Sequence, residues 1–256
     1  MLEHTFVHLP GVGATTERRL WDQGIVRWSD ALCADACPTG FSGGRWALNC
    51  RTLEESMRSL ERGDYRHFAQ GLASAEQWRA WRDFRHGVAY LDIETTGCGS
   101  WDEVTVVGIY DGSRTTCFIA DDNLDELPEA LAQYSMLVTF NGASFDLPFL
   151  RRRFPGIVFD QIHLDLMHAL RRLDLRGGLK AIERTVGLAR DDDIAHLDGW
   201  DAVRLWREWQ RGRRASLDLL VRYNTADIEN LEHLAYMAYT RLRASLCLPC
   251  DGGDAQ

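Results

Sequence analysis

Two acidic residues stand close together in a stretch that otherwise reads as a strand. Asp92 and Glu94 lie in GVAYLDIE (87–94), a run of apolar, β-branched and aromatic residues. Side chains alternate between the faces of a strand, so both carboxylates point to one face, while Leu91 and Ile93 point to the other. Burying such a pair is costly unless a cation compensates it, and a divalent metal with oxygen ligands does so. The pair therefore indicates a metal site, with solvated carboxylates on an open sheet face as the alternative.

A further carboxylate, Asp146, lies in LVTFNGASFDLPFL (137–150), where the sequence predicts that a strand gives way to a helix. We expect Asn141 and Gly142 to form the turn and Ser144 to be the helix N-cap. Asp146 then falls in the first helical turn, where complementing the helix dipole contributes under about 1 kcal/mol. Asn141 is interpreted either as a residue that positions substrate or as one that only shapes the turn.

The third piece is RYNTADIENL, within a long predicted helix at 215–245. Tyr223 and Asp227 are four residues apart, so they share one face of that helix. Leucine and isoleucine residues mark the adjoining apolar side. Taken alone, this pattern fits a tyrosine–aspartate pair at a helix surface equally well.

The elements that must position these residues follow from the hydrophobic pattern. Five short β-branched and aromatic runs are predicted as strands, at 87–94, 104–110, 115–120, 136–140 and 160–166. Helices are predicted at 74–85, 124–134, 179–188, 200–210 and 215–245. Three strands in a meander, followed by strands that alternate with helices, predict an α/β fold with a mixed sheet covered by helices.

Composition limits the classes of protein that fit. The chain has 256 residues, 45% hydrophobic and 26% charged, and no apolar run approaches the ~20 residues of a membrane span. The first residues lack the features of a secretion signal, so we expect a cytoplasmic protein that does not associate with a membrane, with reduced cysteines. The net charge of −9 argues against loose attraction to polyanions. It leaves room for a deep site that holds cations.

Basic residues are clustered in spite of the negative net charge. The clusters lie at 151–154, 171–180 and 211–214. Each is interpreted as a solvated helix face, with a contact to phosphate as the alternative.

In order and approximate spacing, the acidic pieces resemble the three motifs of the DnaQ-like (DEDD) 3′ to 5′ exonuclease superfamily, which has a ribonuclease H-like fold. The matching residues are Asp92-x-Glu94, Asn141 followed by Phe145-Asp146, and Tyr223-x-x-x-Asp227. The resemblance covers residues from about 87 to 240. HLDLMHALRR, LKAIERTVGL and DDDI look most like the YprB-type branch of predicted exonucleases. Because a tyrosine stands four residues before Asp227, the chain resembles the tyrosine subclass.

The resemblance implies a metal-dependent 3′ to 5′ exonuclease that hydrolyses phosphodiester bonds with two Mg²⁺ or Mn²⁺ ions. Asp92 would contact both ions, Glu94 and Asp227 would complete the first site, and Asp146 would help to hold the second ion. Tyr223 would orient the attacking water, since a phenol with a pKa of ~10 is a poor base. The partner would be nucleic acid, a single strand or the 3′ end of DNA, with RNA as an alternative.

Two other functions fit the same residues. One is a catalytically silent nucleic-acid-binding module, and the other is a structure-selective endonuclease, because one fold hosts several activities. Thr95 and Phe145 are expected to contact substrate together with Asn141. Asp165 is expected to be a hydrogen-bonded structural carboxylate.

The chain is expected to divide into a helical N-terminal region (1–85), a ribonuclease H-like exonuclease domain (86–242) and a C-terminal tail (243–256). Residues 6–25 resemble a helix-hairpin-helix element, in which the backbone N–H groups near Gly11 and Gly13 would bind a phosphate. The alternative is an ordinary glycine turn.

The cysteines offer one spacing that is typical of a metal or redox site. Cys247 and Cys250 are separated by two residues, and Cys33, Cys37 and Cys50 are candidate partners. Free thiols are expected, with a zinc or iron–sulfur site as the alternative.

Overall fold

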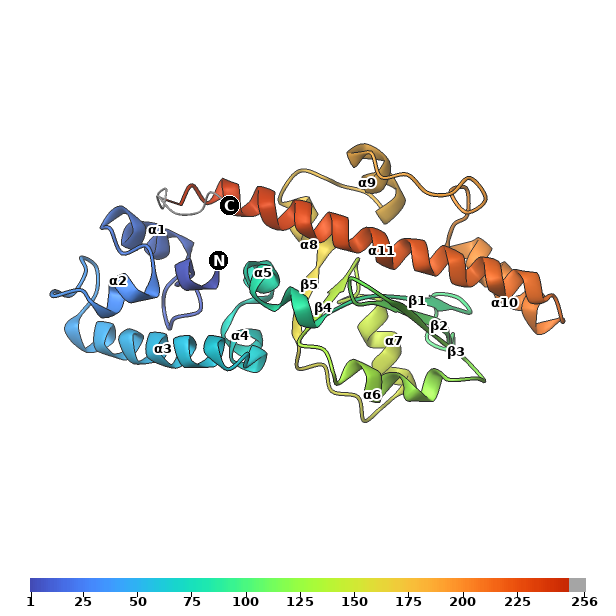
Figure 1. Cartoon of the computed structure of the whole chain (residues 1–256), viewed down its shortest axis with the longest axis horizontal. Coiled ribbons are helices and arrows are strands. Elements are labelled where there is room, and N and C mark those ends of the chain that lie inside the picture. The colour runs from blue at the N-terminus through green and yellow to red at the C-terminus, as the bar shows by residue number, and fades with distance from the viewer. Residues whose placement is uncertain (249–256) are drawn as a thin grey trace.

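Five strands form one mixed sheet at the centre of the molecule (Figure 1). The computed structural model describes residues 1–248. The strand order is β3-β2-β1-β4-β5, where β1 and β2 and likewise β2 and β3 are antiparallel, and β4 is parallel to both β1 and β5. The strands are β1 (Val88–Thr95), β2 (Val104–Tyr110), β3 (Thr115–Ile119), β4 (Met136–Thr139) and β5 (Ile162–Asp165). The predicted fold class, a mixed five-stranded sheet flanked by helices, is confirmed.

Helices cover both faces of the sheet. The long helix α11 (Arg214–Ser245) packs on β1 and β2 on one face, and α6 (Leu127–Leu131) and α7 (Asp146–Arg153) lie on the other (Figure 1). The alternation of β1 explains this arrangement, because Val88 and Tyr90 belong to the core on the α11 side, while Leu91 and Ile93 belong to the core that contains α6 and α7. The remaining helices after the sheet begins are α8 (Leu166–Arg171), α9 (Leu179–Val186) and α10 (Gly199–Gln210).

The N-terminal region is helical, as expected, and lies at one end of the molecule (Figure 1). Its α-helices are α1 (Ala14–Asp22), α2 (Trp28–Leu32), α3 (Gly43–Glu61), α4 (Tyr65–Gly71) and α5 (Trp81–Phe84). Short 3₁₀ helices span Leu2–His4, Ser74–Ala80, Arg85–Gly87 and, later in the chain, Leu124–Glu126. The single helix predicted at 74–85 is therefore a 3₁₀ helix that passes into one α-helical turn.

The glycine turn before α1 is packed against an arginine. Gly11 has a φ of 69°, in the left-handed region that favours glycine. Arg45 Nη2 donates to the carbonyl oxygen of Gly11 at 2.8 Å, and a Cβ at Gly11 would lie 1.5 Å from that nitrogen. The helix expected after the glycines is α1, whereas the segment before them contains only the 3₁₀ helix Leu2–His4 and turns.

The C-terminal part of α11 reaches into the segment expected to be a tail, because the helix ends at Ser245. Cys250 lies outside the described residues. No helix in the described part of the chain is long and apolar enough to cross a membrane.

Candidate active site

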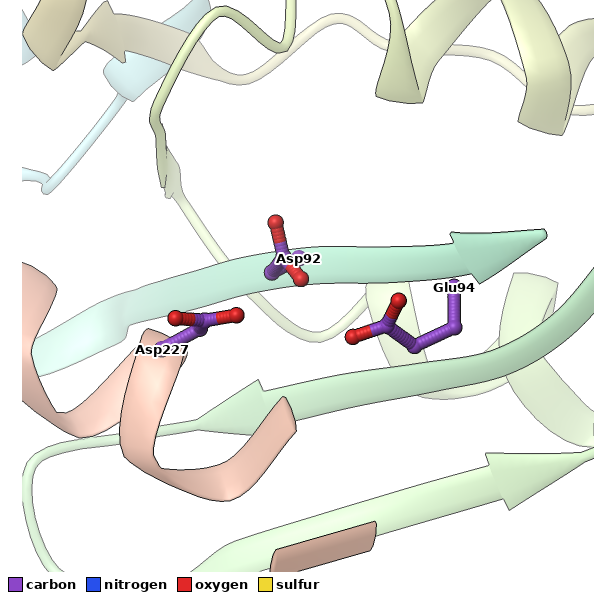
Figure 2. Close-up of side chains that lie close together, drawn as sticks. All are labelled: Asp92, Glu94 and Asp227. Carbon is purple, nitrogen blue, oxygen red and sulfur yellow. The ribbon is translucent and has the colours of Figure 1, made fainter. Parts of the chain in front are cut away.

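Three carboxylates meet where α11 crosses β1. Asp92 and Glu94 project from the same face of β1, as predicted, and Asp227 comes from α11 (Figure 2). One oxygen from each of the three lies within 4.8 Å of the others. Glu94 and Asp227 are buried and Asp92 is half-buried. Residues that are far apart in the sequence thus form one acidic cluster. Figure 2 shows their carboxylates directed toward a shared space.

A glycine on the neighbouring strand lets α11 approach this closely. Gly108 of β2 is the pairing partner of Asp92, and a Cβ there would lie 2.0 Å from Oδ1 of Asn224 on α11. Asn224 Nδ2 donates to Asp92 Oδ2 at 3.0 Å. A Cβ at position 108 would meet the side-chain ends of Asn224 and Ile228, so this glycine leaves room for these two side chains of α11 against β2.

Asp146 lies beside this cluster. It is the first residue of α7, and its side chain is 2% exposed, with Oδ1 buried and without a hydrogen-bond partner among residues 1–248. Among the neighbouring charges, that of Asp146 has the largest effect in raising the pKa of Asp92. Three of the four predicted carboxylates therefore form one cluster, and Asp146 lies close enough for its charge to act on Asp92.

The turn that leads to Asp146 differs from the prediction. The N-cap of α7 is Phe145, which has no capping side chain, so the assignment of Ser144 as N-cap is wrong. Instead the carboxylate of Asp165 accepts hydrogen bonds from the backbone N–H groups of Asn141, at 2.9 Å, and Ala143, at 3.1 Å. A distant residue therefore satisfies two N–H groups of the turn, and at the start of α7 the N–H of Leu147 donates to the carbonyl oxygen of Gly142 at 3.0 Å.

Asp165 also accepts from the N–H of Met167 as the N-cap of α8. These hydrogen bonds confirm that it is a structural carboxylate. Asn141 takes a left-handed conformation, with a φ of 64°. That conformation supports its turn-forming interpretation, and substrate contact by its side chain stays a prediction.

Burial and mutual repulsion make these carboxylates hard to ionise together. Burial raises the pKa of Asp92 and of Glu94 well above the ordinary values, and the neighbouring negative charges add to the effect. Burial raises the pKa of Asp146 to about 7. It raises that of Asp227 to about 6, opposed by the guanidinium of Arg190. Such a cluster favours a bound cation, which would relieve the repulsion.

These pKa shifts predict the pH dependence of folding without metal. A raised carboxyl pKa contributes stability that is complete below the unfolded value of ~3.9 and is lost as the pH rises through the folded value. For Asp146 the loss develops between these two pKa values, from ~3.9 up to its folded pKa of about 7, and is nearly complete above pH 7. We expect the metal-free protein to be less stable at about pH 8 than at about pH 5, by a contribution on the order of 1–3 kcal/mol from this group.

Chemical unfolding in EDTA at several pH values would measure this effect. Asp146→Asn should flatten the dependence, because asparagine does not titrate there. Parallel curves for the wild type and the variant would contradict the prediction.

Tyr223 faces the same space from one turn earlier on α11, and a lysine holds its hydroxyl. Lys180 Nζ, from α9, donates to Tyr223 Oη at 2.9 Å and also to the carbonyl oxygen of Leu197. The ammonium group lies 4.2 Å from the centre of the tyrosine ring. Burial raises the pKa of Tyr223, and the charge of Asp227 adds to it, so the phenol is neutral. The tyrosine can therefore orient a water molecule by hydrogen bonding, but it cannot act as a phenolate near neutral pH.

Arg190 forms an ion pair with one carboxylate oxygen of Asp227. Its Nη2 donates to Asp227 Oδ1, and its guanidinium also pairs with Glu183, at 2.7 Å from Nε and 2.6 Å from Nη2. The side chains of Arg190 and Glu183 are 5% and 1% exposed, and Asn230 donates to Glu183 at 3.0 Å. This network holds one oxygen of Asp227.

Sequence patterns missed both cations. Lys180 was included in the cluster 171–180, which was interpreted as a solvated face, but it is half-buried in the site. The amphipathic pattern of LKAIERTVGL was the one available signal. Arg190 lies between two helices, where no periodicity marks it.

The carboxylates open into a cleft of about 480 Å³. Six of the residues predicted for the site line it, namely Asp92, Glu94, Thr95, Phe145, Tyr223 and Asp227. Asp146 and Asn141 do not line it. Gly11 and Gly13 belong to the N-terminal region and contribute nothing to its lining.

The donor set fits a hard divalent cation. The cluster offers carboxylate oxygens and no histidine or cysteine, and Oε1 of Glu94 is buried without a hydrogen-bond partner within residues 1–248. Oxygen ligands of this kind suit Mg²⁺ or Mn²⁺ better than zinc. Across the described residues, this is the one group of three or more acidic, histidine or cysteine side chains close enough to share an ion. Cys33, Cys37, Cys50 and Cys247 are free thiols.

The fold and this acidic site together define a class of protein. A family model described as RNase_H superfamily matches residues 89–239, and the chain belongs to that superfamily. Its members are usually nucleases, hydrolases that use divalent metal ions.

The particular relatives are remote. No curated protein matches the chain. Among solved structures, the family B DNA polymerase from the hyperthermophilic archaeon Pyrobaculum calidifontis is similar, with a TM-score of 0.45 and 14% identity. The match covers 61% of this chain and 24% of the polymerase chain, so it spans about a quarter of that protein.

Proposed function

We propose that this protein is a metal-dependent 3′ to 5′ exonuclease that hydrolyses phosphodiester bonds in DNA or RNA. The observation that carries the proposal is the cluster of Asp92, Glu94 and Asp227 within 4.8 Å, with Tyr223 one helical turn before Asp227 in the same cleft. The three motifs in their order support assignment to the DnaQ-like superfamily, its tyrosine subclass and the YprB-type branch. We assign the activity to residues 86–242 and treat residues 1–85 as an accessory helical region.

The carboxylates would hold two Mg²⁺ or Mn²⁺ ions. Divalent ions in such a site polarise the phosphoryl group and lower the pKa of water. Asp92, Glu94 and Asp227 would hold one ion, and Asp92 with Asp146 would hold the other.

Tyr223 would orient the attacking water, and Lys180 would position Tyr223. The hydrogen bond from Lys180 leaves the hydroxyl hydrogen of Tyr223 free to donate to a water oxygen. Arg190 would position Asp227, because it holds one oxygen of that carboxylate against the buried Glu183.

Tyr223→Phe is expected to lower kcat by roughly 10- to 100-fold while leaving the Mn²⁺ concentration for half-maximal activity nearly unchanged. The variant removes only the hydroxyl that orients water and keeps every carboxylate. Tyr236→Phe is a matched control, since Tyr236 is on the same helix and is 59% exposed. An equal loss of metal affinity in Tyr223→Phe would mean that the tyrosine has only a structural role.

Cleavage of end-labelled substrates tests the function itself. Single-stranded DNA, duplex DNA and RNA, each labelled at the 5′ end, are incubated with the protein and Mg²⁺ or Mn²⁺. A ladder that shortens from the 3′ end and disappears with EDTA supports the exonuclease. Internal cuts at structured sites would identify the endonuclease instead. Binding without cleavage would identify the silent module.

The glycine turn before α1 is a second candidate contact for nucleic acid. The N-terminal N–H groups of α1 follow Gly13, which is exposed. They would bind a phosphate distant from the cleft, as a helix-hairpin-helix element does.

A further inference from the structure

An exposed tryptophan stands at the rim of the acidic cleft. Trp200 is 71% exposed and lines the same cleft as Tyr223 and Asp227. Of the large hydrophobic side chains exposed in the described part of the chain, it alone lines this cleft. Single exposed apolar side chains are common on protein surfaces, so what distinguishes Trp200 is its place in the lining of the acidic cleft.

The backbone beneath this indole is fixed. Asp198 is the N-cap of α10, and its Oδ1 accepts from the N–H groups of Trp200 at 2.8 Å and Asp201 at 3.0 Å. The N–H of Asp198 in turn donates to Oδ2 of Asp201 at 3.1 Å. The neighbouring Ala202 and Val203 are buried, which anchors the helix to the core. The ring is therefore carried by the capped first turn of a helix that packs on the core.

The rest of the lining suits a nucleotide. The rings of Phe140 and Phe145 are half-buried and line the cleft with Trp200. The interior holds the carboxylate cluster that fits divalent cations, together with the ammonium group of Lys180. A nucleotide has a flat apolar base and an anionic phosphate, so its two ends match the two parts of the cleft. Grooves for single-stranded nucleic acid use this combination of cationic and stacking contacts.

We propose that Trp200 is a stacking platform for an unpaired base next to the scissile phosphate, so that the cleft accepts single-stranded 3′ ends. The proposal rests on the nuclease function above. A base inside a duplex is already paired and covered by its neighbours, and it must be unstacked before its face can meet the indole. A duplex end would therefore be degraded only after it frays.

Abasic substrates isolate the stacking contact. KM and kcat are measured on an oligothymidylate and on the same oligonucleotide with abasic residues at its last two 3′ positions. For the wild type, we expect the abasic change to raise KM by about tenfold. For Trp200→Ala, KM should be high on both substrates and nearly equal, and Trp200→Phe should recover part of the difference. Tyr236→Ala, which changes an exposed ring outside the cleft, should behave as wild type.

Two results would overturn the proposal. One is a wild type that does not distinguish the two oligonucleotides, and the other is a Trp200→Ala variant that distinguishes them as well as wild type does. Binding of labelled DNA and RNA versions in Ca²⁺, without turnover, separates this inference from the activity. If wild type binds the natural oligonucleotide more tightly than the abasic one, in a manner that depends on Trp200, and yet hydrolyses neither, the result contradicts the proposed exonuclease function. The same result supports base stacking on Trp200.

Discussion

Asp92→Asn is expected to reduce hydrolysis by at least about 10³-fold. Asp92 would help to hold both proposed ions, so losing its charge would weaken both sites. Asparagine has nearly the same shape, and its side-chain oxygen can still accept the hydrogen bond from Asn224. The variant also removes one of several repelling charges, so the metal-free fold should be at least as stable as wild type.

Initial rates with a labelled oligonucleotide, together with thermal unfolding in EDTA, would test both parts. Asp122→Asn is the matched control, because Asp122 is an exposed carboxylate in the turn after β3. An Asp92→Asn protein that hydrolyses as fast as this control would refute the metal-site assignment. A folded and inactive variant would support it.

Arg79→Met is expected to destabilise the protein by about 3–5 kcal/mol, through loss of a buried ion pair. Arg79 and Glu17 are each 1% exposed and are joined at 3.0 Å. Glu17 also accepts from the N–H groups of Phe6, at 2.6 Å, and Val7, at 3.2 Å. Without the guanidinium, the carboxylate stays buried and uncompensated, since burial already raises the pKa of Glu17 against the effect of Arg79.

Urea unfolding would measure the loss, and the double variant Glu17→Gln with Arg79→Met should recover much of it because no charge remains buried. Arg153→Met is a suitable control, since its ion pair with Asp125 is 42% and 83% exposed and should contribute ~1 kcal/mol or less. A single Arg79→Met variant as stable as this control would contradict the prediction.

Local patterns predicted the strands well, because their signal is short in range. The strand at 104–110 has the predicted bounds, and the alternation along β1 correctly placed Asp92 and Glu94 on one face. The turn before α7 was predicted without its main support, because the carboxylate of Asp165, far along the chain, holds that turn. No local rule contains that contact.

The same limit applies to the segment at 74–85. Gln77 donates to the carbonyl oxygens of Ala69 and Leu72 and accepts from the N–H of His163. Helical periodicity predicted a regular α-helix here, but the segment with these long-range contacts forms a 3₁₀ helix instead. Lys180 and Arg190 were missed for a related reason, since their partners come from other elements.

The helix that carries Asp227, α11, also packs against the N-terminal region. Farther along α11, Tyr239 packs against Trp78 and Trp81, with ring centres 6.2 and 5.4 Å apart. Asp227 and Tyr239 are separated by about 18 Å of continuous helix. Deleting residues 1–85 would remove Trp78 and Trp81 and expose the apolar face of α11, the helix that positions Asp227. A shortened protein would therefore lose activity because α11 is no longer held in place. That loss would not reveal whether the removed helices touch nucleic acid.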